Sequence, residues 1–217
     1  MMDKNNFRKI VRGARIPAGH RILDVAIAHA LLRRLHALQR AHSRRSRRPF
    51  CVLLYLPLPN EANISPLFAL LRKQKKIHIF VPFMVGISLK IVKYRLPLFT
   101  KKFGIKEPLE SSFAPKTFHV AVVPMLGVDN QLKRIGYGKG MYDRFFATQP
   151  KKPRIFFVAR ELYYSRKNLC DSYDIQADEV LTYKINIKRG KNDRFNRMDA
   201  PKLHCLRPCR GHQHLLD

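Results

Sequence analysis

Phe50-Cys51-Val52-Leu53-Leu54-Tyr55-Leu56 is an uninterrupted apolar run of strand length. A strand with one face in solvent alternates apolar and polar residues, whereas a strand covered on both faces is apolar throughout. The run therefore predicts a central strand, buried on both sides. Similar short runs follow along the chain at residues 77–81, 118–123, 155–159 and 179–182.

Segments with helical character separate these runs. Apolar residues recur at three- and four-residue steps across residues 22–39, and residues 65–74 and 141–148 have helical spacing or composition. Strands that alternate with helices indicate an α/β protein with an open, mostly parallel sheet, flanked by helices on both faces. Apolar and polar residues alternate loosely across residues 89–98, which predicts an additional antiparallel segment. With 217 residues the chain is long enough for one well-buried domain, which we expect to span residues 1–183.

Two basic segments fall outside this pattern. Within residues 40–49, the run Ser43-Arg44-Arg45-Ser46-Arg47-Arg48 carries like charges that repel one another, which favours a solvated basic loop after the first long helix. Residues 184–217 are polar and basic without clear periodicity, and we expect them to form a poorly ordered C-terminal extension. The four cysteines of the chain, Cys51, Cys170, Cys205 and Cys209, are too sparse and irregular for a disulfide framework, so we expect reduced thiols. The cysteines and histidines of this extension could capture a metal weakly, but their spacing fits no closed zinc site, which favours a basic disordered end.

The formal net charge is +28, from 43 Lys and Arg against 15 Asp and Glu. Such an excess either attracts nucleic-acid phosphates, with an affinity that falls as salt rises, or is a solvated surface. We expect no specific nucleic-acid partner, because the chain has neither zinc-finger spacing nor an aromatic RNA-binding segment. No apolar run is long enough to cross a bilayer, and the start lacks the apolar stretch of a secretory signal. A cytoplasmic protein without a membrane partner is therefore expected.

A glycine-rich segment, Arg134-Ile135-Gly136-Tyr137-Gly138-Lys139-Gly140, lies between a predicted strand and a predicted helix. The alternate glycines allow left-handed conformations, in which backbone amides can point together at an anion. Its two cations and the positive end of the following helix favour phosphate as the ligand. The spacing matches neither the Walker pattern nor the dinucleotide fingerprint. A flexible turn is therefore the alternative interpretation.

Prolines follow two of the predicted strands, at Pro82 and Pro124, and are expected to end them at one edge of the sheet. Ligands of open α/β sheets bind at the carboxyl ends of the strands, so the segments after these prolines are candidate site segments. Asp143, three residues beyond Gly140, could hold a magnesium ion that bridges phosphates. Alternatively, it is an acidic residue in a first helical turn, favoured by the helix dipole.

The segment from Val123 to Asp129, followed by the segment from Arg134 to Asp143, resembles the signature of the 5-formyltetrahydrofolate cyclo-ligase family, also called methenyltetrahydrofolate synthetases. Supporting matches are spread in order along residues 4–183. The resemblance implies a single α/β domain of the CoA-transferase-like kind. It also implies an ATP- and magnesium-dependent enzyme that converts 5-formyltetrahydrofolate to 5,10-methenyltetrahydrofolate and releases ADP and phosphate.

The resemblance implies roles for individual residues. ATP would be bound by Lys4, Arg8, Arg134, Gly136, Tyr137, Gly138, Lys139, Gly140 and Asp143. Among these, Arg134, Lys139 and Asp143 would be catalytic, and Asp143 would ligate magnesium. The folate would be bound by Glu61, which hydrogen-bonds the pterin, and by the apolar walls Tyr55, Leu56, Phe103 and Tyr142. Without the resemblance, Lys4 and Arg8 are solvated charges on a first helix and the apolar residues belong to the core.

The chain departs from the family pattern in a few places. Met141 stands where a second aromatic is usual, and Arg160-Glu161 replaces the usual polar pair after the fourth strand. We expect a reduced folate as the partner, with or without a polyglutamate tail, and a monomer or weak dimer. The alternatives are a basic nucleic-acid-binding protein without turnover and a folate-binding relative that has lost catalysis. The presence of Arg134, Lys139 and Asp143 argues against such a loss.

Overall fold

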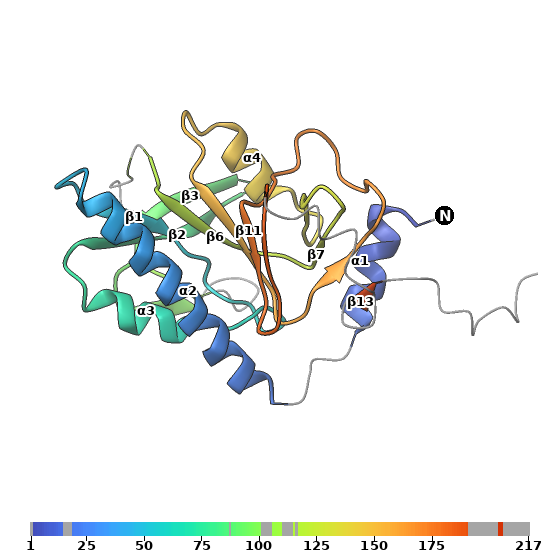
Figure 1. Cartoon of the computed structure of the whole chain (residues 1–217), viewed down its shortest axis with the longest axis horizontal. Helices are drawn as coiled ribbons and strands as arrows, with labels where there is room; N and C mark the ends of the chain where they lie inside the picture. The colour runs from blue at the N-terminus through green and yellow to red at the C-terminus, as the bar shows by residue number, and fades with distance from the viewer. Residues whose placement is uncertain are drawn as a thin grey trace, which may run out of the picture.

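The computed structural model describes residues 2–14, 19–86, 88–100, 106–109, 115, 117–190 and 204–205. Its main element is a seven-stranded sheet in the order β12-β11-β9-β6-β1-β2-β3 (Figure 1). The strands from β11 to β2 in that order run parallel, and the two edge strands run antiparallel to their neighbours. The bounds are β1 (Phe50–Leu53), β2 (Ile77–Val85), β3 (Ser88–Lys93), β6 (Val120–Pro124), β9 (Arg154–Val158), β11 (Glu179–Leu181) and β12 (Asn186–Lys188).

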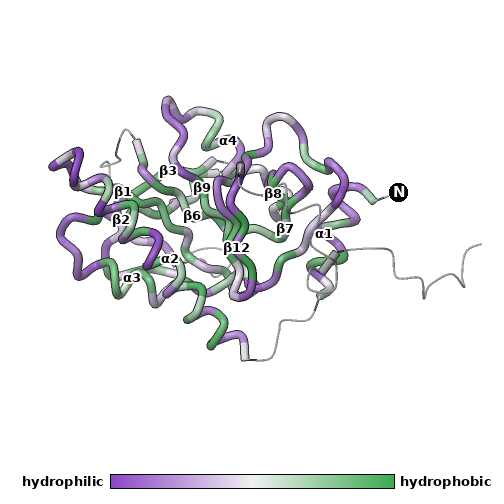
Figure 2. Tube along the Cα trace, in the orientation of Figure 1, coloured by the Kyte–Doolittle hydropathy of each residue, from purple (hydrophilic) through white to green (hydrophobic). Residues whose placement is uncertain are grey.

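Helices cover both faces of this sheet, as predicted. The helices α2 (His20–Ser43) and α3 (Ser65–Arg72) pack on one face, and α4 (Met141–Ala147) packs on the other (Figure 1). Successive side chains of a strand point to opposite faces, so Val52 joins the cluster under α2 and α3 while Leu53 joins the cluster that contains Phe146 of α4. The apolar strands of this interior and the hydrophilic connections around it are visible in Figure 2. The predicted α/β fold is thus confirmed.

Of the two prolines predicted to end strands, only one does. β6 ends at Pro124, but β2 continues through Pro82 to Val85. The pairing explains the difference, because β2 pairs with β1 only as far as Phe80 and beyond that residue pairs with β3 alone. Proline lacks the amide donor that pairing on both sides requires, and it is tolerated where one side of the strand is unpaired. The antiparallel segment predicted at residues 89–98 corresponds to β3, which pairs antiparallel with β2.

The two basic segments are also shorter than predicted. α2 continues to Ser43, so the basic loop begins after that residue and not at residue 40. The sheet likewise extends past residue 183, because β12 pairs with β11 through Val180 and Ile187. Ile187 is buried, which gives this last strand an apolar anchor that the polar composition around it conceals. Most of the predicted C-terminal extension lies outside the described residues.

A second, smaller layer lies beside the main sheet. It consists of α1 (Lys4–Gly13) and a four-stranded sheet of β13 (His204–Cys205), β10 (Tyr163–Tyr164), β7 (Gly127–Val128) and β8 (Arg134–Ile135). Phe7 and Val11 of α1 pack against Leu126 and Ile135. A further hairpin pairs β4 (Phe99–Thr100) with β5 (Lys106–Glu107). None of the helices in the described part of the chain is long and apolar enough to span a membrane.

The strand order places a topological switch at β1. The chain passes from β1 to β2 on one side and then returns to form β6 on the other side of β1. At such a point the connections leave the sheet in opposite directions and open a crevice at the carboxyl ends of the strands. The segments after β1 and β6 are those in which the sequence predicts the site.

Candidate active site

An apolar cavity of about 420 Å³ opens at the carboxyl ends of β1 and β6. Most of the residues predicted to bind the folate lie in its wall, together with part of the glycine-rich segment; Phe103 lies outside the described residues. Tyr137 and Lys139, predicted to bind ATP, also face this cavity. The wall includes Tyr55, Leu56, Glu61, Pro82, Met84, Leu89, Glu107, Pro124, Arg134, Tyr137, Lys139, Gly140, Met141 and Tyr142.

The tyrosines that form the aromatic walls of this cavity are enclosed by the protein, and this burial sets the state of their phenol groups. Tyr55 is fully buried, and its hydroxyl donates a hydrogen bond of 2.6 Å to the carbonyl oxygen of Ala62. Burial raises the pKa of Tyr55 and of Tyr142 well above the usual value, and it raises the pKa of Tyr137 to about 12. All three phenols are therefore neutral at physiological pH and present apolar ring surface to a ligand.

Glu61 places a buried carboxyl in the wall of the apolar cavity. Its Oε2 atom accepts a hydrogen bond of 2.9 Å from the backbone N–H of Leu58. Burial raises the pKa of Glu61 to about 7, against the opposing effects of that hydrogen bond and of Arg134 and Arg160. A buried carboxyl of this kind can accept N–H donors from a flat, polar ring that is otherwise enclosed by apolar walls.

A second, basic cavity of about 280 Å³ adjoins the apolar one. Arg134 and Gly140 line both cavities. Its wall combines α1, the glycine-rich segment and α4: Lys4, Arg8, Arg134, Gly136, Gly138, Gly140, Asp143, Arg144, Ala147, Tyr173 and Asp174. Residues of α1 and residues 173–174, which are far apart in the sequence, thus meet around the glycine-rich segment.

The glycine-rich segment needs its glycines for two reasons. Gly138 and Gly140 have φ values of +99° and +59°, in the left-handed region that side chains disfavour. At Gly136 the reason is space, because a Cβ atom there would lie 2.3 Å from a terminal nitrogen of Arg134. Gly136 therefore keeps room for the Arg134 guanidinium.

Arginines from the flanking helices fix the path of this segment. Arg8 Nε donates to the carbonyl oxygen of Gly136 at 2.8 Å, and Arg12 donates to that of Tyr137 at 2.5 Å. Arg144 donates to the carbonyl oxygen of Lys139 at 2.8 Å. These bonds anchor the segment between α1 and α4 and bring several cations to it, which is the electrostatic setting that an anion requires.

Arg134 is buried at the boundary between the two cavities. One terminal nitrogen pairs with Asp143 Oδ2 at 2.9 Å, and the other donates to the carbonyl oxygen of Pro124 at 3.4 Å. Its guanidinium carbon lies 5.3 Å from the centroid of the Tyr142 ring. Within the described residues, Arg134 Nε is buried without a hydrogen-bond partner. Since a buried donor without a partner costs free energy, this atom favours an incoming acceptor.

Asp143 is occupied by protein partners. Besides the bond to Arg134, its Oδ1 atom accepts a hydrogen bond of 3.2 Å from the backbone N–H of Ile175. Nowhere in the described ranges do three or more His, Cys, Asp or Glu side chains gather in a way that could hold a metal ion. Magnesium held largely by nucleotide phosphates needs only one or two protein carboxylates, so the magnesium role of Asp143 stays a prediction. In this structure Asp143 is the anionic partner that orients Arg134.

Lys4, predicted to bind phosphate, is paired as well. Its ammonium group forms an ion pair with Asp174 and lies 3.6 Å from Asp171 Oδ2. The pair joins α1 to the segment before β11. Of the predicted anion-binding residues on α1, Arg8 makes the direct contact with the glycine-rich segment.

Two contributions to the site were not predicted from the sequence. Arg12 follows Lys4 and Arg8 at four-residue steps, so helical spacing alone could have placed it on the same face of α1. The second is a buried bidentate ion pair between Arg160 and Asp24, at 2.8 and 3.0 Å, which joins the carboxyl end of β9 to α2. Its partners are far apart in the sequence, and no local pattern indicates the pairing.

The fold and these cavities define an α/β protein with an apolar site and an anion site side by side. A model of the 5-formyltetrahydrofolate cyclo-ligase family matches residues 14–183. The chain belongs to this family.

Solved structures agree with this fold. The NMR structure of the 5,10-methenyltetrahydrofolate synthetase from Aquifex aeolicus is similar over 99% of this chain and 100% of its own, with 24% identity and a TM-score of 0.69. A 5,10-methenyltetrahydrofolate synthetase from Mycoplasma pneumoniae is similar over 82% of this chain and 98% of its own, with 22% identity and a TM-score of 0.57. Among curated proteins, no match to the sequence was found.

Proposed function

We propose that the protein is an ATP-dependent 5-formyltetrahydrofolate cyclo-ligase, which forms 5,10-methenyltetrahydrofolate, ADP and phosphate. The observation that carries this proposal is that Arg134 and Gly140 line both the apolar and the basic cavity. A phosphoryl transfer between two bound molecules needs such a shared boundary, because donor and acceptor must meet in line. Family membership supplies the substrates.

In this proposal the apolar cavity takes the pterin. Tyr55, Leu56 and Tyr142 enclose the ring, and the ionised carboxylate of Glu61 accepts its N–H groups. The basic cavity takes the triphosphate, with Arg8 and Arg134 close to the glycine-rich segment. The guanidinium of Arg134 would face the transferred phosphoryl group, where its unpartnered Nε gains an acceptor.

The reaction then divides into two steps. The formyl oxygen attacks the γ-phosphorus, and the bond from that phosphorus to the β-γ bridging oxygen breaks, so that ADP leaves. N10 next attacks the formyl carbon, loses its proton, and expels the phosphorylated oxygen as inorganic phosphate. An amide oxygen leaves poorly as hydroxide and well as phosphate, so ATP provides the driving force. The protein positions the reactants and stabilises the negative charge on the transferred group.

The stoichiometry of the reaction tests this proposal. Release of ADP should depend on 5-formyltetrahydrofolate and should equal the methenyl product formed, with no release when either substrate is omitted. Folate binding without any ADP release would instead support a non-catalytic folate-binding protein. ADP release that is indifferent to the folate would contradict the assignment of the apolar cavity.

The pH dependence of folate binding should follow Glu61. Because the pKa of Glu61 is raised to about 7, the carboxyl is mostly protonated below that pH and ionised above it. Ionised Glu61 is the form that accepts pterin N–H groups, so affinity should rise with pH. Between about pH 6 and about pH 8 we expect a gain of roughly tenfold in affinity. A fluorescence titration with 5-formyltetrahydrofolate in the absence of ATP measures it.

Two variants isolate this effect. Glu61→Gln should bind more weakly at high pH and lose most of the pH dependence between these limits. Glu107→Gln is the matched control, because Glu107 is also buried, also lines the apolar cavity and accepts a backbone hydrogen bond of 3.0 Å from Met84. If Glu61→Gln kept the wild-type pH dependence, Glu61 would not be the group that binds the pterin.

A further inference from the structure

The amino ends of the parallel strands form an edge of the sheet that lies opposite the two cavities. The connections that enter β1, β2 and β9 at this edge contain residues 44–48, 72–76 and 151–154. Parallel strands bring their amino ends to the same side, so segments far apart in the sequence meet there. We call the Arg and Lys residues of these three ranges the basic edge.

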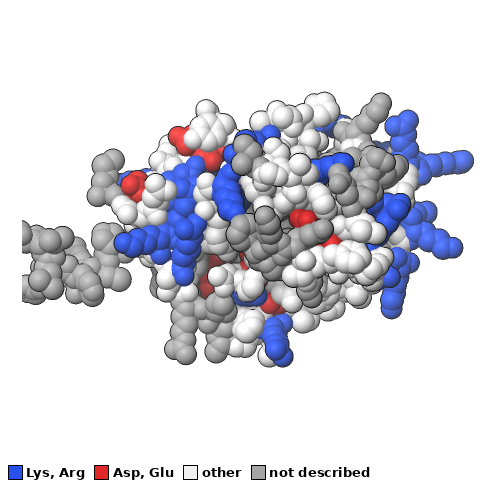
Figure 3. All heavy atoms as spheres, turned by 180° about the vertical axis from the view of Figure 1, so that it is seen from behind, with Lys and Arg blue, Asp and Glu red and all other residues white. Residues whose placement is uncertain are grey.

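Every residue of the basic edge has an exposed side chain, and the three ranges contain no Asp or Glu. Viewed from behind, Lys and Arg side chains project at this end of the molecule (Figure 3). The nearest acids of β11 and its entry are already paired, since Asp178 binds Arg189 at 2.5 Å and Glu179 binds Arg34. The positive charge of the edge is therefore not offset by these carboxylates.

The arginine-rich part of this edge is built into the fold. A ring nitrogen of His42 lies 2.9 Å from the carbonyl oxygen of Arg48, and the Ser46 hydroxyl accepts from the Arg48 N–H at 3.1 Å. The ring of His42 packs against that of His119, with centroids 4.3 Å apart, and His119 Nδ1 accepts from the backbone N–H of Cys51 at 2.9 Å. The loop is thus fastened to the sheet, which reduces the entropy lost when it binds a partner.

The chemistry of the edge favours phosphodiesters. Guanidinium groups bind phosphate oxygens through paired N–H donors. The large apolar side chains that the described surface exposes lie in other segments, so the edge offers no group to insert into a bilayer. It also exposes no aromatic ring on which unpaired bases could stack. We propose that the basic edge binds the phosphate backbone of double-helical nucleic acid, without reading its sequence, at a place separate from the active site.

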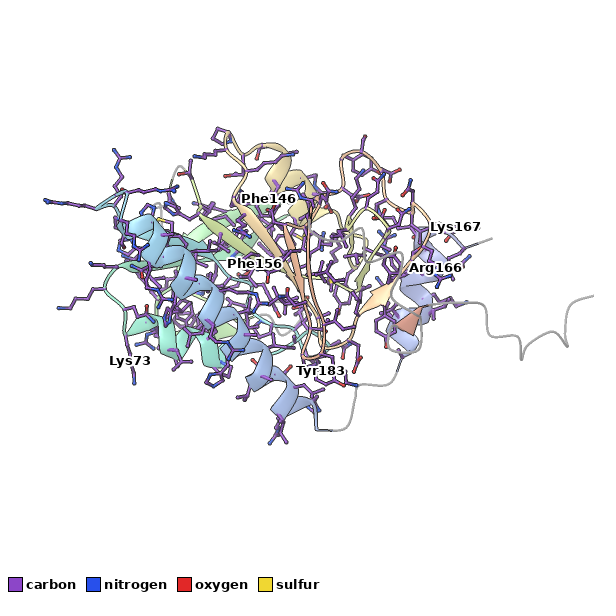
Figure 4. The ribbon with its side chains drawn as sticks, viewed as in Figure 1. Lys73, Phe146, Phe156, Arg166, Lys167 and Tyr183 are labelled. Carbon is purple, nitrogen blue, oxygen red and sulfur yellow. The ribbon has the colours of Figure 1, made fainter. Side chains whose placement is uncertain are left out.

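The salt dependence of binding tests this proposal on the full-length protein. The edge variant replaces Arg44, Arg45, Arg47 and Arg48 with Gln. Its matched control replaces the exposed Lys9, Arg21, Arg166 and Lys167 with Gln, so that both variants lose the same charge. Arg166 and Lys167 lie at the end of the molecule opposite Lys73 of the basic edge (Figure 4). Dissociation constants for short duplex RNA and duplex DNA of mixed sequence are measured from roughly 50 to 200 mM NaCl.

For the edge variant, the slope of log affinity against log salt should become shallower by roughly 2 to 4 on the duplexes. The control should change the slope by less than about 1. Turnover and melting temperature should match the wild type in both variants, because none of these residues lines the cavities.

Three results would overturn the proposal. Equal losses in the two variants would mean that diffuse charge, and not the edge, attracts nucleic acid. An unchanged edge variant would place the binding in another segment. Binding to phosphatidylserine vesicles that depends on the edge arginines, without duplex binding, would make a membrane the partner.

Discussion

Arg134→Ala should lower the turnover of 5-formyltetrahydrofolate by roughly 100- to 1,000-fold, the usual cost of removing one preorganised donor from a transition state. The reason is the position of Arg134, which is buried between the two cavities with Nε lacking a partner among the described residues. Single-turnover kinetics at saturating ATP and folate measure the chemical step. A rate within about threefold of the wild type would remove Arg134 from the phosphoryl-transfer site.

Companion variants separate charge from geometry. Arg134→Lys keeps the positive charge but loses the planar fork whose two terminal nitrogens donate to Asp143 and Pro124, so it should recover only part of the rate. Gly136→Ala leaves every charge in place, but its new methyl group would displace the Arg134 guanidinium, so its rate should fall as well. Lys139→Ala, on the apolar side of the segment, should lower turnover by at least about tenfold.

Asp143→Asn should lower both stability and turnover, in a pattern that identifies the role of the carboxylate. The side chains of Arg134 and Asp143 are only 7% and 11% exposed. Removing one charge of such a buried pair leaves the other unpaired, at a cost of about 3 to 5 kcal/mol. A loss of that size corresponds to a melting temperature lower by roughly 6 to 20 °C in a domain of this length. Thermal unfolding without ligands measures it.

The magnesium role suggested by the sequence predicts another pattern. If Asp143 also ligated magnesium, added magnesium would restore part of the activity of Asp143→Asn. We expect a lower melting temperature from the loss of the ion pair and no rescue by magnesium. The double variant Arg134→Met/Asp143→Leu should be more stable than Asp143→Asn yet inactive, because it removes both charges of this pair and leaves neither one unpaired.

The periodicity of the apolar residues was sufficient to predict the sheet and its covering helices. The apolar run at residues 50–56 predicted a strand buried on both faces. The observed strand β1 is shorter and ends at Leu53, but it is buried on both faces because Val52 and Leu53 face different helix layers. Errors arose where tertiary pairing decides the outcome. β2 passes Pro82 because only one neighbour pairs there, and β12 forms because Ile187 is buried beside β11. Neither condition can be read from local sequence.

The individual residues of the site could be predicted from the sequence, but the ion pairs between them could not. The glycine-rich segment, Glu61 and the aromatic walls were identified by motif, and the structure brings them to one crevice. Two of the ion pairs around the site, Lys4 with Asp174 and Arg160 with Asp24, join residues more than a hundred positions apart. Because such pairs form only when the chain has folded, the sequence did not indicate the protein partners of Lys4 and Asp143.

Formation of the methenyl product tests the central claim most directly. The purified protein is mixed with ATP, magnesium and 5-formyltetrahydrofolate, and absorbance in the methenyltetrahydrofolate band is followed with time. We predict that absorbance grows in proportion to enzyme concentration, stops when ATP is omitted, and is nearly abolished in Arg134→Ala. Folate binding would show that the wild-type protein is folded. If such a protein gave no growth of the methenyltetrahydrofolate band under these conditions, the result would contradict its assignment as a cyclo-ligase.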